Sequence, residues 1–245
     1  MIIDMHCHAL PGLDDGAKDE EETVKMLRMA WKEGIGGILF TPHYNIDREK
    51  NFSERCRETH RRTRSLAEKV NPKLQIFLGN EIYYSSGVVE ALQKGEALPI
   101  NGTRYVLIEF APYVELLTVR KAVQEFLYAG YFPILAHMER YECLRKINHV
   151  QELVELGAFM QVNASSLEGK MGIRVKWYLK KLIRADLVHV IGTDAHGSRH
   201  RRPKIRNCLT YLDKKAGVTC RKKLTEKNPA KIIRGEHICG EDRIK

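Results

Sequence analysis

Residues 1–16 read MIIDMHCHALPGLDDG, and this stretch decides how the rest of the chain is interpreted. The apolar run at 2–5 predicts a short buried strand that ends in His6 and His8. Side chains alternate along an extended strand, so these two imidazoles point to the same side. A turn with proline and glycine then brings round Asp14 and Asp15. Imidazole and carboxylate ligands suit zinc, manganese or iron, so the stretch predicts one part of a metal site.

Apolar runs of strand length alternate with amphipathic runs of helix length along the rest of the chain. Further strands are expected at 37–40, 75–78, 105–108, 132–136, 159–162 and 187–191. Helices are expected at about 19–34, 52–70, 87–94, 116–128, 150–156, 175–184, 206–215 and 228–234. Repeated strand–helix units imply parallel strands joined by right-handed crossovers. Seven units favour an α/β barrel over an open sheet, and the absence of a linker predicts one domain over residues 1–245.

The composition limits the class of protein. No apolar run approaches the ~20 residues that cross a bilayer, and residues 1–16 are too charged for a signal peptide. Six cysteines without a CxxC spacing indicate free thiols in a reducing compartment, so we expect a cytoplasmic protein that is not a membrane protein. The net charge of +10 favours anionic partners, namely phosphorylated substrates, nucleic acid or an acidic membrane face. A solvated basic surface explains this charge equally well.

Almost every predicted strand is followed by a histidine or an acidic residue. The group comprises His6, His8, Asp15, His43, Glu81, Glu109, His137, Asp194 and His196. One such residue alone is more often a cap or a surface group. In a barrel of parallel strands, however, all of these ends lie on the face where active sites form. Crowded carboxylates and imidazoles are costly to bury unless a cation neutralises them, so the combination predicts a multinuclear metal centre.

Six motifs carry a resemblance to a known family. They are His6-x-His8, the PGLDDG loop at 11–16, Thr41-Pro-His43, Gly79-Asn-Glu81, His137-x-Glu-Arg140 and Asp194-Ala-His196. Together they resemble the polymerase-and-histidinol-phosphatase (PHP) superfamily, most closely its bacterial manganese-dependent tyrosine-protein phosphatases of capsule and exopolysaccharide operons. The resemblance implies a distorted (β/α)7 TIM-like barrel with three metal ions at the C-terminal ends of the strands. Mn²⁺ is the metal that it implies, although the ligand set also accepts Fe or Zn.

The resemblance also implies a role for each residue. One ion takes His6, His8, Glu81 and Asp194; a second shares Glu81 and adds Glu109 and His137; a third takes Asp15, His43 and His196. Arg140 and a second arginine are expected to bind the phosphate. Spacing favours Arg201 as the second, although Arg202 is the residue that precedes Pro203. Asn163 and His200 are expected to line the substrate pocket.

The implied activity is hydrolysis of phosphotyrosine on proteins by water that the metal ions activate. The expected partner is a phosphotyrosine protein, such as the tail of a bacterial tyrosine kinase, and no nucleic acid is expected. One alternative is a small-molecule phosphatase such as histidinol-phosphate phosphatase. A nuclease is a weaker alternative, since the chain lacks an aromatic and basic platform for bases. A non-catalytic metal-stabilised module is disfavoured because the ligand set and Arg140 are complete.

A second phosphatase motif is misleading. The segment from Cys56 to Thr63 matches C-x5-R-T, the phosphate loop of cysteine-based tyrosine phosphatases. Such a loop follows a strand and turns flexible glycines toward the phosphate. Here the segment lacks glycine and lies in a predicted helix, so we expect no nucleophilic role for Cys56. Tyr44, Tyr113 and Tyr141 are expected either to flank an aromatic leaving group or to pack at the rim of the site.

Overall fold

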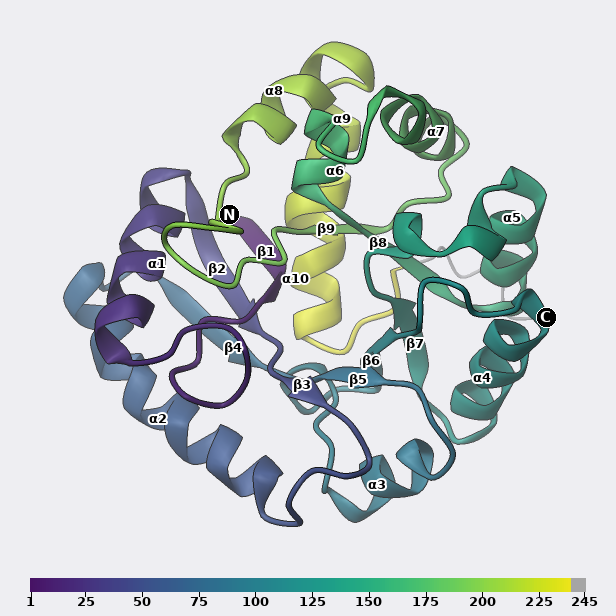
Figure 1. Cartoon of the computed structure of the whole chain (residues 1–245). Coiled ribbons are helices and arrows are strands. Elements are labelled where there is room, and N and C mark those ends of the chain that lie inside the picture. Colours follow the sequence, from purple (N-terminus) through teal and green to yellow (C-terminus); the bar gives the residue numbers. More distant parts are fainter. Residues whose placement is uncertain (239–245) are drawn as a thin grey trace.

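The computed structural model describes residues 1–238, so Cys239 lies outside the described residues. Parallel strands run around a central space in Figure 1. They are β1 (Ile2–Cys7), β2 (Ile35–Phe40), β3 (His43–Tyr44), β4 (Gln75–Leu78), β5 (Glu81–Tyr83), β6 (Tyr105–Glu109), β7 (Phe132–Leu135), β8 (Phe159–Asn163) and β9 (Val190–Gly192). Their pairing gives two parallel sheets, in the orders β1-β2-β4 and β3-β5-β6-β7-β8-β9.

Two barrel strands are broken where the chain cannot continue its ladder. Pro42 has no N–H to donate, and it separates β2 from β3. The neighbouring strand breaks at Gly79 and Asn80, between β4 and β5. The Asn80 amide bridges the gap, because it donates to the Pro42 carbonyl at 2.9 Å and accepts from the Leu98 N–H at 2.8 Å. With each broken pair counted once, residues 1–238 form seven barrel strands, as the sequence predicts.

The barrel closes where β1 meets the chain beyond β9. A single parallel bridge joins Cys7 to Ala195. The His8 N–H donates to the Ala195 carbonyl at 2.8 Å, and the Asp194 N–H donates to the His6 carbonyl at 2.8 Å. Closure by a bridge rather than a full ladder makes this a distorted (β/α)7 barrel, which confirms the predicted fold class.

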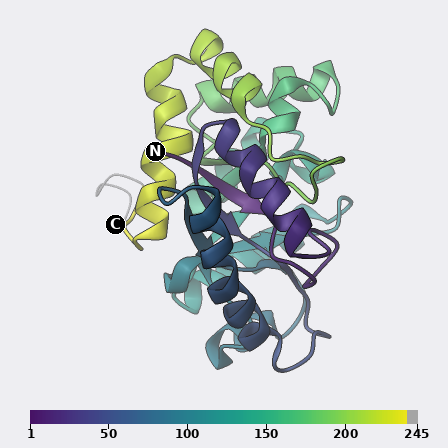
Figure 2. The same cartoon turned by 90° about the vertical axis from the view of Figure 1, so that its left-hand side faces the viewer.

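Helices cover the outside of the barrel. They are α1 (Glu20–Lys32), α2 (Phe52–Val70), α3 (Val88–Lys94), α4 (Leu116–Tyr128), α5 (Ile147–Leu156), α6 (Ala164–Glu168), α7 (Ile173–Arg184), α8 (Arg206–Lys215), α9 (Val218–Lys222) and α10 (Asn228–Ile233). Short turns of 3₁₀ helix lie at Ile100–Gly102, Met138–Arg140 and Glu142–Leu144, and a π turn precedes α10. Helix α10 lies across the end of the barrel on the side of the N-terminus (Figures 1 and 2). The opposite end is left for the site.

Strand alternation divides the buried residues into two cores. The inner core fills the barrel and includes Leu107 of β6, Ile134 of β7 and Ile232 of α10. The outer core packs the alternate positions, such as Val106 and Ile108, against the helices. The inner core stops below Glu109, which lies two positions beyond Leu107 on the same side of β6. The upper end of the barrel interior is therefore lined by polar side chains.

Some element boundaries differ from the predictions. The strand expected at 187–191 begins only at Val190, after a left-handed turn at Asp186 (φ 58°) that ends α7. Strands β3 and β5 and helix α6 are too short to give a periodic signal. None of the helices within residues 1–238 is both long and apolar enough to cross a lipid bilayer.

Candidate metal centre

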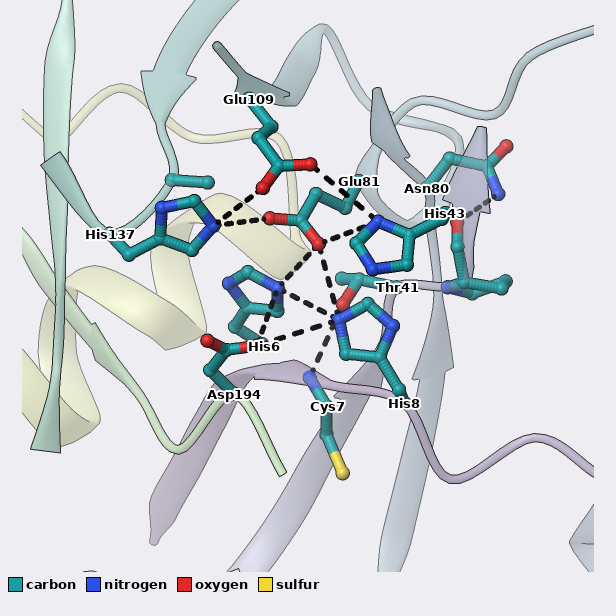
Figure 3. Close-up of polar contacts among 12 residues, drawn as sticks. His6, Cys7, His8, Thr41, His43, Asn80, Glu81, Glu109, His137 and Asp194 are labelled. Atoms are coloured by element: carbon teal, nitrogen blue, oxygen red, sulfur yellow. Dashed lines mark hydrogen bonds and ion pairs between the residues drawn. The ribbon is translucent and has the colours of Figure 1, made fainter. Parts of the chain in front are cut away.

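A register shift in β1 places the first two histidines inside the barrel. Ile3 and Met5 belong to the inner core, so unbroken alternation would turn His6 and His8 outward. The pairing of β1 with β2 shifts between Asp4 and Cys7, and Cys7 then packs in the outer core. This irregularity turns His6 and His8 into the mouth and leaves Cys7 pointing away from them (Figure 3).

Glu81 lies at the centre of the cluster. Its Oε2 atom is 3.0 Å from His6 Nε2, 3.2 Å from His8 Nε2 and 3.1 Å from His43 Nδ1. Its Oε1 atom is 2.8 Å from His137 Nε2. Figure 3 shows these rings arranged around one fully buried carboxylate. Oε2 nevertheless has no hydrogen-bond partner of correct geometry among the described residues. The nitrogens crowd this oxygen without bonding to it, which is the pattern of ligands that share a cation.

The remaining predicted ligands surround Glu81. Glu109 is 3.2 Å from His137 Nε2 and 3.7 Å from His43 Nδ1. Asp15, on the loop after β1, is 3.5 Å from His43 and 3.4 Å from His196. The structure therefore brings all nine predicted residues into one cluster. The groups are not fully separate, because the ligand atoms of His8 also lie within 4.8 Å of those of Asp15, His43 and His196.

Asp194 joins the cluster to both predicted arginines. Its Oδ1 is 3.6 Å from His6 Nε2 and 2.6 Å from Arg201 Nη2, and its Oδ2 is 2.5 Å from Arg140 Nη2. The structure thus favours Arg201 over Arg202, which forms no ion pair within residues 1–238. Asp194 and Arg201, like His137, have positive φ angles (54°, 45° and 30°). Such backbone costs about 1–3 kcal/mol per residue and is typical of sites where side-chain placement matters.

The pKa shifts show how strongly the imidazoles and carboxylates of the cluster act on one another. Burial opposes protonation of His8, but its hydrogen bond with Asp14 and the nearby carboxylate of Glu81 raise its pKa to about 10. Burial likewise opposes protonation of His137, whereas Glu109 and Glu81 raise its pKa to about 9. Burial favours a neutral Glu81, yet the facing imidazoles hold its pKa well below the usual range. In the absence of cations, protons on imidazoles compensate the buried carboxylates. Since the donors are imidazole nitrogens and carboxylate oxygens, the site fits divalent Mn, Fe or Zn.

Three polar residues outside the predicted ligand set hold the cluster in place; of these, only Asp14 is singled out by the sequence, as part of the acidic loop. Asp14 Oδ2 is 2.7 Å from His8 Nδ1 and accepts from the His43 N–H at 3.1 Å. Gln161 Oε1 lies 3.1 Å from His6 Nδ1 and accepts from the His137 N–H at 2.6 Å. Asp4 accepts from the Thr193 N–H at 2.7 Å, which ties β1 to the β9 end. The sequence contains one indication of a role for Asp4 and Gln161, since each is a polar residue inside an apolar strand.

The other predicted residues fall at different places. Asn163 is buried and its Nδ2 donates to Asp194 Oδ2 at 2.8 Å, while His200 is exposed beside Arg201.

Tyr141 is a packing residue, because its hydroxyl donates to the Ala136 carbonyl and accepts from the Phe110 N–H. Tyr44 is also buried, whereas Tyr113 is 81% exposed. Cys56 is buried in α2, and burial raises its thiol pKa to about 12, which rules out an activated thiolate.

A parallel barrel that gathers imidazoles, carboxylates and arginines at its C-terminal mouth has the architecture of a metal-dependent hydrolase. The chain belongs to the capsular polysaccharide synthesis CpsB/CapC family, whose family model matches residues 2–234. This membership confirms the branch of the PHP superfamily that the motifs indicate.

Individual relatives agree with the family. The tyrosine-protein phosphatase CpsB of Streptococcus pneumoniae is 32% identical over 243 residues, which cover 97% of this chain and all of the relative. The tyrosine-protein phosphatase YwqE of Bacillus subtilis is 34% identical over 242 residues, covering 97% of this chain and 93% of the relative. A solved structure from work on YwqE and CpsB, described as unique metal-dependent tyrosine phosphatases, has a TM-score of 0.85 at 32% identity. It covers 97% of this chain and 96% of the solved one.

Proposed function

We propose that this chain is a metal-dependent protein-tyrosine phosphatase, with manganese as its metal. The observation that carries the proposal is the convergence of nine imidazole and carboxylate side chains, Glu81 and Asp194 among them, into one cluster with two arginines at its edge. The family and the names of its relatives supply the substrate class, phosphotyrosine on proteins. The physiological substrate that we propose is the phosphorylated tail of a bacterial tyrosine kinase of capsule or exopolysaccharide synthesis.

We assign the ligands in three overlapping sets. His6, His8, Glu81 and Asp194 would hold one ion, Glu81, Glu109 and His137 a second, and Asp15, His43 and His196 a third. When bound, the ions would supply an activated water and neutralise phosphoryl charge. Asp14 and Gln161 keep the imidazoles of His8 and His6 oriented toward Glu81, as outer partners of metal ligands do.

The arginines would bind the phosphoryl group. Arg140 and Arg201 approach Asp194 from two sides, which places both guanidinium groups at the edge of the cluster. A planar guanidinium donates two parallel hydrogen bonds to phosphoryl oxygens and spreads positive charge over them. Asn163 donates to Asp194 Oδ2, the oxygen that Arg140 also contacts, and His200 would contact the substrate from the rim. No side chain of the protein is needed as a nucleophile.

Turnover of a phosphotyrosine peptide tests the proposal. The metal-loaded protein should hydrolyse the peptide in preference to histidinol phosphate and to single-stranded DNA. Chelation should abolish the activity and Mn²⁺ should restore it. Glu81→Gln should lower kcat/KM by at least roughly 100-fold, because loss of even an outer partner of a metal ligand costs roughly 10–100-fold.

Glu152→Gln is the matched control for Glu81→Gln, since Glu152 pairs with Arg120 on the surface between α4 and α5. It should keep wild-type turnover. Faster turnover of histidinol phosphate than of the peptide would transfer the assignment to a small-molecule phosphatase. Full activity after removal of all divalent ions would refute a metal-dependent mechanism.

A further inference from the structure

A cavity of about 370 Å³ opens beside the phosphate-binding edge of the cluster. Its floor contains Asp194 and Asn163, and its wall is formed by the chain around α6 and the loop between β9 and α8. Six cationic side chains line it: Arg140, Lys170, Arg199, Arg201, Arg202 and Lys204. Glu168 and Asp194 are the acidic residues of the lining. The cavity therefore carries four more positive than negative formal charges.

Most of this positive charge is not paired. Arg140 and Arg201 are held by Asp194. Lys170, Arg199, Arg202 and Lys204 are exposed and form no ion pair within residues 1–238. Some surface cations elsewhere are paired, as Arg62 is with Glu20, and others are not; what sets these four apart is that they line one cavity. Like charges that line one cavity repel each other, and an anion that enters the cavity lowers this repulsion.

The opposite side of the mouth has a different charge balance. A second cavity, of about 520 Å³, lies between the β1–α1 loop and the β9–α8 loop. Its lining includes Lys18, Lys25, Arg199 and Arg201, but also four acids, Asp15, Asp19, Glu21 and Glu22. Arg199, His200 and Arg201 line both cavities and form the ridge between them. The basic side of the mouth is thus confined to the cavity beside Arg140.

We infer that this cavity is a second anion-binding subsite, which receives another negatively charged group of the same polypeptide while the scissile phosphotyrosine lies at the metal cluster. The inference rests on the proposed function and specifies its substrate class as polyanionic phosphotyrosine segments. Lys170, Arg202 and Lys204 bind the second anion by charge-assisted hydrogen bonds, and the hydroxyl of Ser165 adds a neutral donor.

The second anion has two chemical sources, a neighbouring phosphotyrosine or an acidic side chain. Asp194 and Arg201 lie both at the edge of the cluster and in the lining of the cavity, so the second group is a near neighbour of the first on the same segment. A phosphate carries more charge and more acceptor oxygens than a carboxylate. The doubly phosphorylated peptide is therefore the better substrate of the two.

Three peptides of one length test the subsite. The first has one phosphotyrosine in neutral flanks. The other two carry, in addition, a second phosphotyrosine or a glutamate at the second position. Wild-type protein should show about tenfold lower KM for the doubly phosphorylated peptide than for the neutral one, which corresponds to about 1.4 kcal/mol. Lys170→Ala/Lys204→Ala should remove that preference and leave kcat/KM for the neutral peptide unchanged. With non-hydrolysable phosphonate peptides, fluorescence anisotropy should show the same loss of preference: the double variant should bind the doubly and singly charged peptides with similar Kd values.

Lys181→Ala/Arg184→Ala is the matched control, because it removes two exposed cations from α7, away from the cavity. This control variant should retain the preference for the doubly phosphorylated peptide. Equal KM values for the neutral and doubly phosphorylated peptides, or equal losses in both double variants, would overturn the subsite. Failure of wild-type protein to hydrolyse even the neutral peptide would instead refute the proposed phosphatase activity.

Discussion

At the scale of single residues, the candidate ligands could be predicted because each follows a strand. His6 directly follows an apolar run, and His43 and Glu81 each come three residues after one; a barrel brings such positions together. The residues that orient them could not be ranked in the same way. The family resemblance already groups Asp15 with His43 and His196, which the structure places near it, whereas only the fold shows that the adjacent Asp14 lies against His8.

The pH dependence of stability tests this description of His8. Its folded pKa of about 10 lies above the usual 6.5, so its contribution to stability is complete below about pH 6.5 and is lost as the pH rises toward 10. His137, with a pKa of about 9, acts in the same direction. Between pH 7 and 9 the Tm of the metal-free protein should therefore fall by several degrees, at about 2–4 °C per kcal/mol. Differential scanning calorimetry measures this decline.

Asp14→Asn should make the decline shallower, because His8 loses the carboxylate partner that raises its pKa. Glu21→Gln, at an exposed pair with Lys25, should leave the decline as it is. With Mn²⁺ bound, the trend should reverse, since metal ions bind deprotonated imidazole and their affinity rises with pH. A metal-free Tm that rises steadily from pH 7 to 9 would show that His8 and His137 do not carry the extra protons.

At the scale of elements, periodicity predicts the strands and helices but not their local irregularities. The break at Pro42 and its repair by Asn80 depend on a contact between two strands. The register shift in β1 depends on its pairing with β2, and the sequence 2–8 by itself suggests unbroken alternation. These two irregularities determine which side chains enter the mouth, so the sequence predicts the metal cluster better than the backbone that forms it.

The contact between β9 and β1 gives a prediction at this scale. A Cβ atom added at Gly192 would lie 2.4 Å from His6 Cβ and 3.1 Å from the His6 backbone nitrogen. His6 cannot move without leaving Glu81, so Gly192→Ala should lower the free energy of unfolding by about 3 kcal/mol and weaken metal binding. Urea denaturation and a Mn²⁺ titration measure the two effects.

Gly36→Ala is the matched control for Gly192→Ala. The added Cβ would come as close, 2.6 Å, but to the Cγ atom of Met1, a flexible side chain at the N-terminus that can turn away. It should cost less than about 1 kcal/mol and leave metal binding unchanged. Equal destabilisation by the two substitutions would contradict a specific fit of β9 against His6.

At the scale of the whole molecule, the two ends of the barrel have different roles. Apolar side chains and α10 close the end at the N-terminus, where Ile232 packs with Ile3 and Tyr105. The opposite end gathers the imidazoles, carboxylates and arginines. The net charge of +10 does not say where the basic residues lie in the fold. The structure places six of them around the cavity beside Asp194. This unequal distribution gives the mouth a preferred side for anionic substrates.

The central claim is that several divalent ions share the carboxylate of Glu81 at this mouth. Anomalous diffraction from crystals grown with Mn²⁺ tests it most directly, because it locates each ion without reference to activity. We predict about three manganese peaks, each within about 2.0–2.5 Å of nitrogen or oxygen atoms from the nine candidate ligands, with Glu81 bridging two of them. A cluster free of manganese under saturating Mn²⁺, with Glu81 still surrounded by protonated imidazoles, would contradict the account.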